Sequence, residues 1–300
     1  MFFDHSVLVT GASGFLGGVV MARLQSLGSR VVGTTHAFFP GRSDLVEVNL
    51  EDSDSLSRLN RWGPFDAVLH FAAVLPGRRG DLETLIANEC MTYNLGKWTV
   101  EQKIGKFIYA SGCNVYGLRA DPCSEATVSQ PHNFYAVSKL ACENLLNVVV
   151  GETNTELCVL RISAPYGPNM VADTVVTLFL KRVSQGLPLE LMGSGKRSQD
   201  FVYQEDVASA FVLALQRRAT GLFNISSGRP VSMRELAETV LEVFGRPFAG
   251  NILNLGADPQ EYYRGSFLTQ AAVDSFGYEA KVGLKQGLRK TAEGLGLLKG

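Results

Sequence analysis

The chain has 300 residues, 46% of them hydrophobic and 19% charged, so it can bury a substantial core and is neither disordered nor fibrous. Its 28 Lys and Arg residues are balanced by 29 Asp and Glu residues, which leaves no overall positive field to attract nucleic acid or an anionic membrane. We therefore expect a small-molecule partner, with no nucleic acid and no membrane.

The five cysteines are odd in number and include no C-x-x-C pair, a composition that disfavours a disulfide framework and a zinc site. Residues 1–5 contain no basic segment followed by an apolar one, and no apolar run approaches the roughly 18 residues that a membrane span needs. We expect a reducing, cytoplasmic location and no metal.

Short β-branched strands alternate with helical segments along the first half of the chain. The predicted strands are 6–10, 30–33, 46–50, 67–71, 106–110 and 157–162, and the first helix is predicted at 18–27. Strands 67–71 and 106–110 are apolar almost throughout, which is typical of a parallel sheet covered on both faces. The pattern predicts an α/β fold with a Rossmann-type doubly wound parallel sheet.

After Ala164 the chain becomes rich in Pro and Gly, and helices are then predicted near 207–216 and 233–244. A smaller, mixed α/β substrate lobe is expected to begin there. We predict a dinucleotide-binding domain of residues 1–165 that also receives about 200–226, and a substrate lobe of residues 166–199 and 227–300.

Gly11, Gly14 and Gly17 follow the first strand and open the first helix, which is the setting that a phosphate-binding turn requires. Glycine allows close backbone approach, and the helix N-terminus offers free N–H groups and about half a positive charge to a pyrophosphate. The G-x-x-G-x-x-G spacing points toward short-chain dehydrogenases rather than the simplest dinucleotide folds.

The second strand lacks at its end the acidic residue that would bind the adenosine 2′-hydroxyl of NAD, since Thr34, Thr35 and His36 stand there. His36 or Arg42 can instead meet a 2′-phosphate, so we favour NADP over NAD, with exposed loop positions for both side chains as the alternative. Asn49, after the third strand, is placed to hydrogen-bond the adenine edge.

Two Y-x-x-x-K patterns occur, Tyr93 with Lys97 and Tyr135 with Lys139, and each puts both side chains on one helix face. We assign catalysis to Tyr135 and Lys139, because they follow strand 106–110 at the end of the sheet where ligands bind. A phenol ordinarily has a pKa of about 10, and a nearby ammonium stabilises the phenolate. Such a tyrosine can exchange a proton with a substrate oxygen while a hydride moves at the adjoining carbon.

Over nearly its whole length the chain resembles the extended short-chain dehydrogenase/reductase family of nucleotide-sugar epimerases, dehydratases and reductases. The matching strings, in order, are TGASGFLGG, DAVLHFAA, Asn88 before KFIYAS, NVYG, YAVSK, LRISAPYGP, DFVYQEDVA and FNISSG. The resemblance implies a nucleoside-diphosphate sugar as substrate and a homodimer paired through helices near 82–102 and 135–150.

The residues and the resemblance together give two sets of expected contacts. The cofactor set is Gly11, Ser13, Gly14, Phe15, Leu16, Gly17, His36, Arg42, Asn49, Leu50, Phe71, Ala72, Ala73, Asn88, Tyr135 and Lys139. The substrate set is Asn114, Tyr166, Asn169, Arg197, Gln199 and Arg264.

Two departures from the family pattern fall in these sets. Gly112 stands where members usually carry a Ser or Thr that binds the substrate oxygen, and loss of one such donor costs on the order of a hundredfold in rate. The resemblance leaves Ser111, Cys113, Asn114, a substrate hydroxyl or water to replace it; we favour Ser111 as the catalytic donor, with Cys113 second. Gln199 replaces a usual Arg against the diphosphate, so Arg197 or Arg264 is expected to meet the phosphates.

Cys113 and Asn114 also hold the positions of the Asp-Glu pair of 4,6-dehydratases, which disfavours dehydration. The length and the missing carboxylate after the second strand favour reduction of a 4-keto nucleotide sugar. A 4-epimerase that retains NAD is the first alternative, and a cofactor-binding homologue without turnover is the second.

Overall fold

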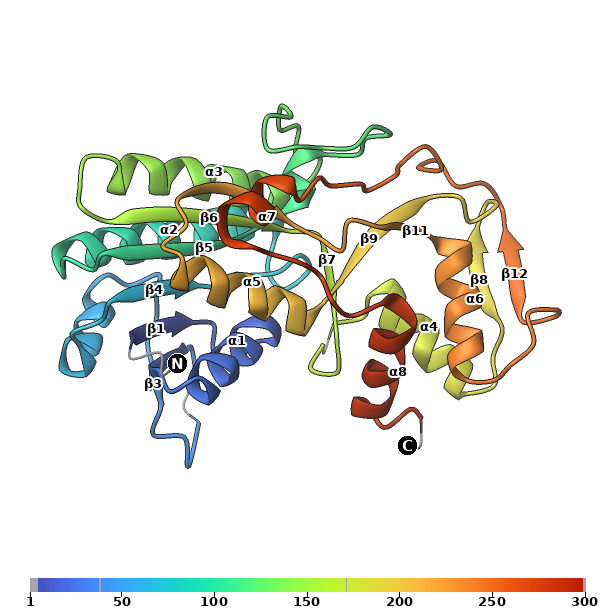
Figure 1. Ribbon diagram of the computed structural model, residues 1–300, viewed down its shortest axis with the longest axis horizontal. Helices are drawn as coiled ribbons and strands as arrows, with labels where there is room; N and C mark the ends of the chain where they lie inside the picture. Colours follow the sequence, from blue (N-terminus) through green and yellow to red (C-terminus); the bar gives the residue numbers. More distant parts are fainter. Residues whose placement is uncertain (1–4, 38, 171, 299–300) are drawn as a thin grey trace.

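The computed structural model describes residues 5–37, 39–170 and 172–298. Within these residues, seven parallel strands form a central sheet in the order β10-β6-β5-β4-β1-β2-β3 (Figure 1). The strands are β1 Ser6–Thr10, β2 Arg30–Thr35, β3 Leu45–Glu47, β4 Ala67–His70, β5 Lys106–Gly112, β6 Glu156–Ile162 and β10 Gly221–Ile225. The prediction that no leader opens the chain concerns residues 1–5, and residues 1–4 lie outside this description.

The predicted strands are all present, but the third is shorter than the sequence pattern predicts. Strand β3 ends at Glu47, whereas the apolar pattern predicts a strand to Leu50. The backbone N–H of Asn49 donates to Ser55 Oγ at 3.0 Å, and its side-chain oxygen accepts from the Glu51 N–H at 3.1 Å. These local bonds turn the chain away from the sheet edge, as Asn side chains often do.

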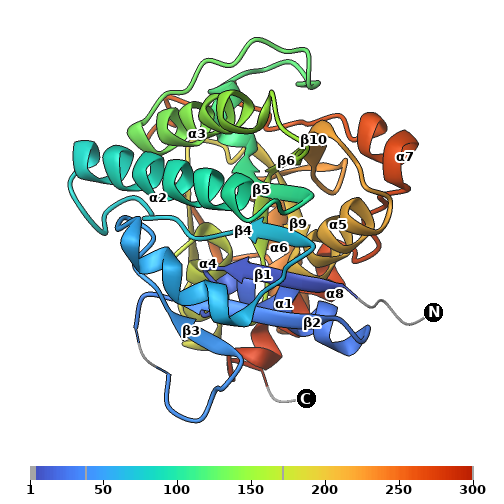
Figure 2. The same cartoon turned by 90° about the vertical axis from the view of Figure 1, so that its left-hand side faces the viewer.

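Helices cover both faces of the central sheet, as Figure 2 shows. On one face α1 (Phe15–Ser26) packs beside α5 (Gln204–Gln216), and on the other α2 (Asp81–Glu101) packs beside α3 (Phe134–Val150). The 3₁₀ segment η1 (Asp54–Trp62) also covers the second face. Each layer has its own fully buried apolar core, so the predicted doubly wound Rossmann-type sheet is confirmed.

A smaller group of elements lies at the far end of the molecule (Figure 1). One sheet has the order β11-β9-β7 and contains parallel and antiparallel pairs, and a second pairs β12 with β8. The elements are β7 Ala164–Tyr166, α4 Val175–Ser184, β8 Leu189–Met192, β9 Ser198–Tyr203, β11 Pro230–Ser232, α6 Met233–Val243, β12 Ile252–Leu255 and α8 Leu284–Gly294. The predicted smaller, mixed α/β lobe is thus present.

The chain crosses more than once between the two groups. After β9 it returns through α5 to β10 at the edge of the central sheet, and α7 (Gln270–Phe276) later packs against β10. Of the helices in the described ranges, none is long and apolar enough to cross a membrane. The strand order reverses direction between β1 and β4, which is the point where such sheets bind ligands at the carboxyl ends of their strands.

Candidate active site

The turn after β1 is built so that a second backbone can approach it closely. Gly11 has φ +65°, and a methyl group there would come within 2.8 Å of the Ala72 nitrogen. A methyl group on Gly17 would collide with the Gly11 carbonyl oxygen. Helix α1 begins after Gly14 with no side-chain cap and no acidic residue in its first turn, so its N–H groups and partial positive charge are available to a pyrophosphate.

The remaining predicted contacts of this turn lie beside those N–H groups. Ser13 is exposed, and Phe15 and Leu16 are half-buried at the start of α1. These positions fit a dinucleotide lying across the helix N-terminus, with no bulky side chain at the three glycines in its way. The sequence order alone predicts this turn, because every part of it lies within eight residues of Thr10.

The turn after β4 is tied to the end of β1 through a buried histidine. Thr10 Oγ1 accepts hydrogen bonds from the Phe71 and Ala72 N–H groups, each at 3.2 Å, and lies 2.7 Å from His70 Nδ1. His70 Nε2 lies 3.1 Å from Thr92 Oγ1. Burial, assisted by the charge of Lys139, lowers the pKa of His70 to about 3, so the ring is neutral and the turn carries no extra charge.

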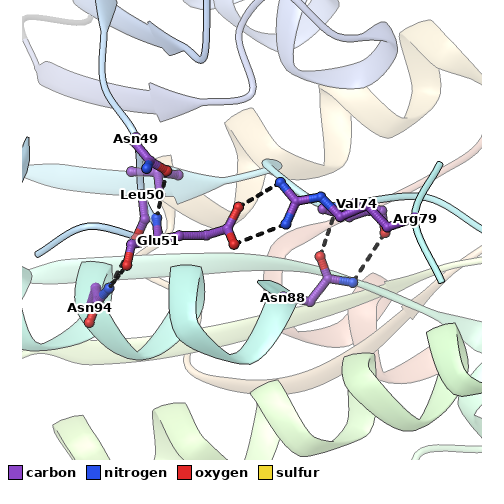
Figure 3. Close-up of polar contacts among 7 residues, drawn as sticks. All are labelled: Asn49, Leu50, Glu51, Val74, Arg79, Asn88 and Asn94. Carbon is purple, nitrogen blue, oxygen red and sulfur yellow. Dashed lines mark hydrogen bonds and ion pairs between the residues drawn. The ribbon is translucent and has the colours of Figure 1, made fainter. Parts of the chain in front are cut away.

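Asn88 of α2 holds the loop after β4 through hydrogen bonds to Val74, as Figure 3 shows. Asn88 Oδ1 accepts from the Val74 N–H at 2.7 Å, and Nδ2 donates to the Val74 carbonyl at 3.2 Å and to Ser138 Oγ at 3.0 Å. Both amide donors are therefore engaged within the protein. Asn88 positions the loop that carries Ala72 and Ala73, which are both half-buried.

An ion pair joins the loops after β3 and β4 beside the predicted adenine position. Arg79 donates to both carboxylate oxygens of Glu51, at 2.8 and 2.9 Å, and Asn94 Nδ2 donates to the carbonyls of Leu50 and Glu51 at 3.1 Å each (Figure 3). Asn49 is exposed and Leu50 is buried. Sequence reasoning missed this ion pair, since no sequence pattern indicates that residues 51 and 79 are in contact.

At the end of β2 the structure places the two candidates for a 2′-phosphate differently. His36 is exposed. Arg42 is held by Asp44 through two hydrogen bonds of 2.7 and 2.9 Å, and this guanidinium lowers the pKa of Asp44 to about 2. Asp44 engages Nε and Nη2 of Arg42, so a 2′-phosphate would meet this guanidinium through Nη1 or in competition with Asp44.

Tyr135 and Lys139 come together in the first turns of α3, as their spacing predicts. The Asn133 side chain caps the helix by accepting from the Ala136 N–H at 2.8 Å, which sets the position of Tyr135. Lys139 is buried, donates to the Ala110 carbonyl at 2.8 Å, and has its ammonium 5.7 Å from the centre of the Tyr135 ring. The other pair, Tyr93 and Lys97, has its tyrosine exposed on α2.

The residues after Ala110 have separate partners. Ser111 Oγ donates to Glu143 at 2.5 Å, and Glu143 accepts two further bonds from Arg161, at 2.6 and 3.0 Å. The Cys113 thiol donates to the Arg161 carbonyl, and burial holds its pKa well above the ordinary thiol value. All four side chains are buried. Sequence reasoning missed this network, because Ser111 and Arg161 lie 32 and 18 residues from Glu143 along the chain.

A cavity of about 490 Å³ opens beside Asn114 and the N-cap residue Asn133. Asn114, Arg197 and Gln199 line it, together with His132 and Tyr263, which sequence reasoning did not single out. Arg197 NH1 donates to the Gln260 side chain at 3.1 Å, and burial raises the pKa of Tyr263 to about 12. Its lining comes from the segments that precede α3 and from the smaller group of elements, and Tyr135, in the first turn of α3, lies just after the lining residue Asn133 without lining the cavity itself.

Three predicted substrate residues lie outside the lining of this cavity. Tyr166 is fully buried and packs edge-on against Tyr203 at 5.5 Å between ring centres. Asn169 is exposed. Arg264 donates to the carbonyls of Glu261 and Tyr263 at 2.6 and 3.2 Å, so part of its guanidinium is already engaged.

Comparison with known proteins identifies relatives of this whole arrangement. A dTDP-4-dehydro-6-deoxyglucose reductase of Escherichia coli is 28% identical over 261 residues, which cover 79% of this chain and 81% of the reductase. The structure of the UDP-glucose 4-epimerase of Thermotoga maritima with UDP-glucose has a TM-score of 0.85 at 25% identity, over 96% of this chain and 97% of the epimerase. That of the Thermus thermophilus UDP-glucose 4-epimerase with NAD has a TM-score of 0.83 at 25% identity, over 97% and 98% of the two chains.

A family model extends the same relationship along the sequence. It is described as the NAD dependent epimerase/dehydratase family and matches residues 7–226, from β1 to the end of the central sheet. The match includes the glycine turn, the buried end of β4 and the Tyr135–Lys139 pair. Because it spans well over half of the 300 residues, the chain belongs to the NAD dependent epimerase/dehydratase family, as its motifs predict.

Proposed function

We propose that this protein reduces the 4-keto group of a nucleoside-diphosphate sugar with a nicotinamide cofactor. The observation that favours this reaction over dehydration is that, among the described residues that line the cavity, none is a carboxylate. Elimination of water from a sugar needs an acid and a base to move two protons, whereas hydride transfer at a single carbon needs one proton donor. Tyr135 fits that single role.

The chain's own residues supply the proton and the binding geometry. When bound, the reduced nicotinamide supplies the hydride. Tyr135 donates its phenolic proton to the C4 oxygen as the hydride reaches the carbon, and the Lys139 ammonium stabilises the phenolate that remains. Because the Ala110 carbonyl holds Lys139 in place, the ammonium stays near the tyrosine through the reaction.

The substrate is expected to lie along the cavity. Arg197 is the lining residue with a guanidinium, whose paired N–H groups suit a diphosphate, and Gln199 adds a neutral amide beside it. Phe201, Val176 and Met233 give the same cavity an apolar wall that suits a base. On this proposal residues 1–165 with about 200–226 hold the cofactor, and residues 166–199 and 227–300 hold the substrate.

A 4-epimerase is the second candidate, favoured by the likeness to two UDP-glucose 4-epimerases over nearly the whole chain. It would use the same Tyr135 and Lys139, but oxidise and then reduce the same carbon with no net consumption of cofactor. The reductase is placed first because the Escherichia coli reductase is 28% identical. The two reactions differ in their cofactor balance.

The test incubates purified protein with dTDP-4-dehydro-6-deoxyglucose and either NADH or NADPH, and follows loss of nicotinamide absorbance. Stoichiometric oxidation, with a reduced sugar nucleotide found by mass spectrometry, supports the reductase. In parallel, UDP-glucose is incubated with the protein and NAD and examined by NMR for the 4-epimer. Epimer formation without cofactor consumption would instead establish the second candidate, and inactivity in both assays would reject both.

A further inference from the structure

Three successive residues at the carboxyl end of β5 differ in what they offer to a substrate. The Ala110 carbonyl is engaged by Lys139, and the Ser111 hydroxyl is engaged by Glu143. Gly112 has no side chain to offer. None of the three residues therefore offers a free side-chain donor to a substrate.

The space beside Gly112 is filled by a neighbouring amide. A Cβ built on Gly112 would lie 2.6 Å from Asn114 Oδ1 and 3.5 Å from Asn114 Cγ, closer than real Cβ contacts allow for the oxygen. Asn114 belongs to the 3₁₀ segment η2 (Cys113–Tyr116), which packs against α3. The carboxamide therefore takes the place that a side chain at residue 112 would occupy.

The oxygen of the Asn114 amide makes no hydrogen bond within the described part of the protein. Asn114 Oδ1 is buried and has no hydrogen-bond partner within the described ranges, so no bond to this oxygen fixes the direction of the amide. The residue is half-buried and lines the cavity together with His132 and Asn133. Asn133 is the N-cap of α3, two residues before Tyr135. With the oxygen turned toward Gly112, the N–H₂ group of the amide faces another direction.

The other two candidates for a donor at this place are committed elsewhere. Ser111 gives its proton to Glu143, whose carboxylate is fixed in turn by Arg161. Cys113 is 2% exposed and gives its thiol proton to the Arg161 carbonyl. Neither can turn toward the cavity without breaking a bond to the buried Glu143–Arg161 pair.

We infer that the Asn114 amide donates a hydrogen bond to the reacting oxygen of the sugar beside Tyr135, and that residue 112 is glycine because this amide needs its space. The inference rests on the proposed function and names the group that orients its substrate. The alternative reading of Gly112, a loop that has simply lost its donor, gives Asn114 no role in turnover.

The test is a cycle of three variants, Asn114→Ala, Gly112→Ser and the double variant, assayed for kcat and KM with the substrate and cofactor of the wild-type reaction. Asn114→Ala should lower kcat about a hundredfold, the usual cost of one such donor. Gly112→Ser should also be slow, because its Cβ would rotate the Asn114 amide out of the direction in which it donates. The double variant should be at least about tenfold faster than Asn114→Ala, because the serine hydroxyl then has room to act as donor.

Cofactor binding and a control variant separate this role from a structural one. The Kd for the nicotinamide cofactor should be the same in all variants. The control for kcat is Asn154→Ala, which removes an exposed amide shortly before β6. Retention of wild-type kcat by Asn114→Ala, or a double variant no faster than Asn114→Ala, would overturn the inference while the proposed function stands. A wild-type protein inactive on both sugar nucleotides would overturn the proposed function, and this assignment with it.

Discussion

Tyr135 is the side chain whose hydroxyl should matter to turnover without mattering to the fold. We expect Tyr135→Phe to lower kcat by at least about a hundredfold, the usual contribution of a positioned general acid. The ring remains 5.7 Å from Lys139 in the wild type and keeps its shape in the variant, so cofactor affinity should not change. Steady-state kinetics with cofactor titration by fluorescence checks both parts, and Tyr93→Phe is the matched control. Wild-type turnover in Tyr135→Phe would assign the proton to another group.

Arg42 also belongs to the residue scale, because its ion pair with Asp44 limits how much affinity it can add for a 2′-phosphate. Asp44 already neutralises this half-exposed guanidinium, and solvent screens the remaining charge, so a 2′-phosphate would gain little net affinity from Arg42. We expect Arg42→Ala to change the ratio of NADH to NADPH affinities by less than about threefold. His36→Ala, measured beside it by calorimetry, tests the other candidate. A selective loss of NADPH binding in Arg42→Ala would contradict this expectation.

At the scale of elements, the contact between β1, α1 and β4 depends on the absence of a side chain at one position. Gly17→Ala would press a methyl group onto the Gly11 carbonyl, and we expect a loss of about 1–3 kcal/mol in unfolding free energy together with weaker cofactor binding. Gly105→Ala is the matched control, because no atom of the described residues lies within 4 Å of a Cβ built there. Urea denaturation and cofactor titration measure both effects. Equal unfolding free energies and cofactor affinities in the two variants would show that the turn adjusts to the added methyl group.

The joint between β1 and β4 should also make stability depend on pH through His70. In the folded protein the pKa of His70 is about 3, below the ordinary value of 6.5. Between pH 3 and 6.5 the unfolded chain therefore binds a proton at His70 that the folded chain does not bind. This contribution is present above pH about 6.5 and is lost at up to about 1.4 kcal/mol per unit as the pH falls toward 3. His70→Gln should remove that part of the slope in urea denaturation at pH 5 and 7. An unchanged slope would mean that the folded protein takes up the proton at His70.

At the scale of the whole molecule, α2 and α3 present apolar side chains away from the sheet. Leu82, Ile86 and Tyr93 on α2 and Val148 on α3 are each more than 40% exposed, although the two helices pack side by side. We expect two copies to pair through these helices, as the family resemblance implies. Ile86→Glu should raise the dimer dissociation constant at least about a hundredfold by burying an unpaired charge. Val128→Glu, in an exposed loop, is the control, and sedimentation of the wild type as a monomer at micromolar concentration would refute the dimer.

The sequence by itself determined the features whose parts are close along the chain. The glycine turn, the Y-x-x-x-K pair and most strand positions depend on local periodicity and on residues within a few turns of each other, which a sequence pattern records directly. The third strand is the exception among the predicted strands, because Asn49 makes local side-chain bonds that compete with the sheet.

Only the tertiary structure decided which of the candidate polar groups are free. Ser111 meets Glu143 from 32 residues away, and Cys113 meets the Arg161 carbonyl from 48 residues away, so the fold commits both groups that the sequence favoured as donors. The Asn114 amide remains, in space that Gly112 leaves open. The physical reason is that a hydrogen bond is fixed by distance and direction in space, and these depend on how the strands and helices pack.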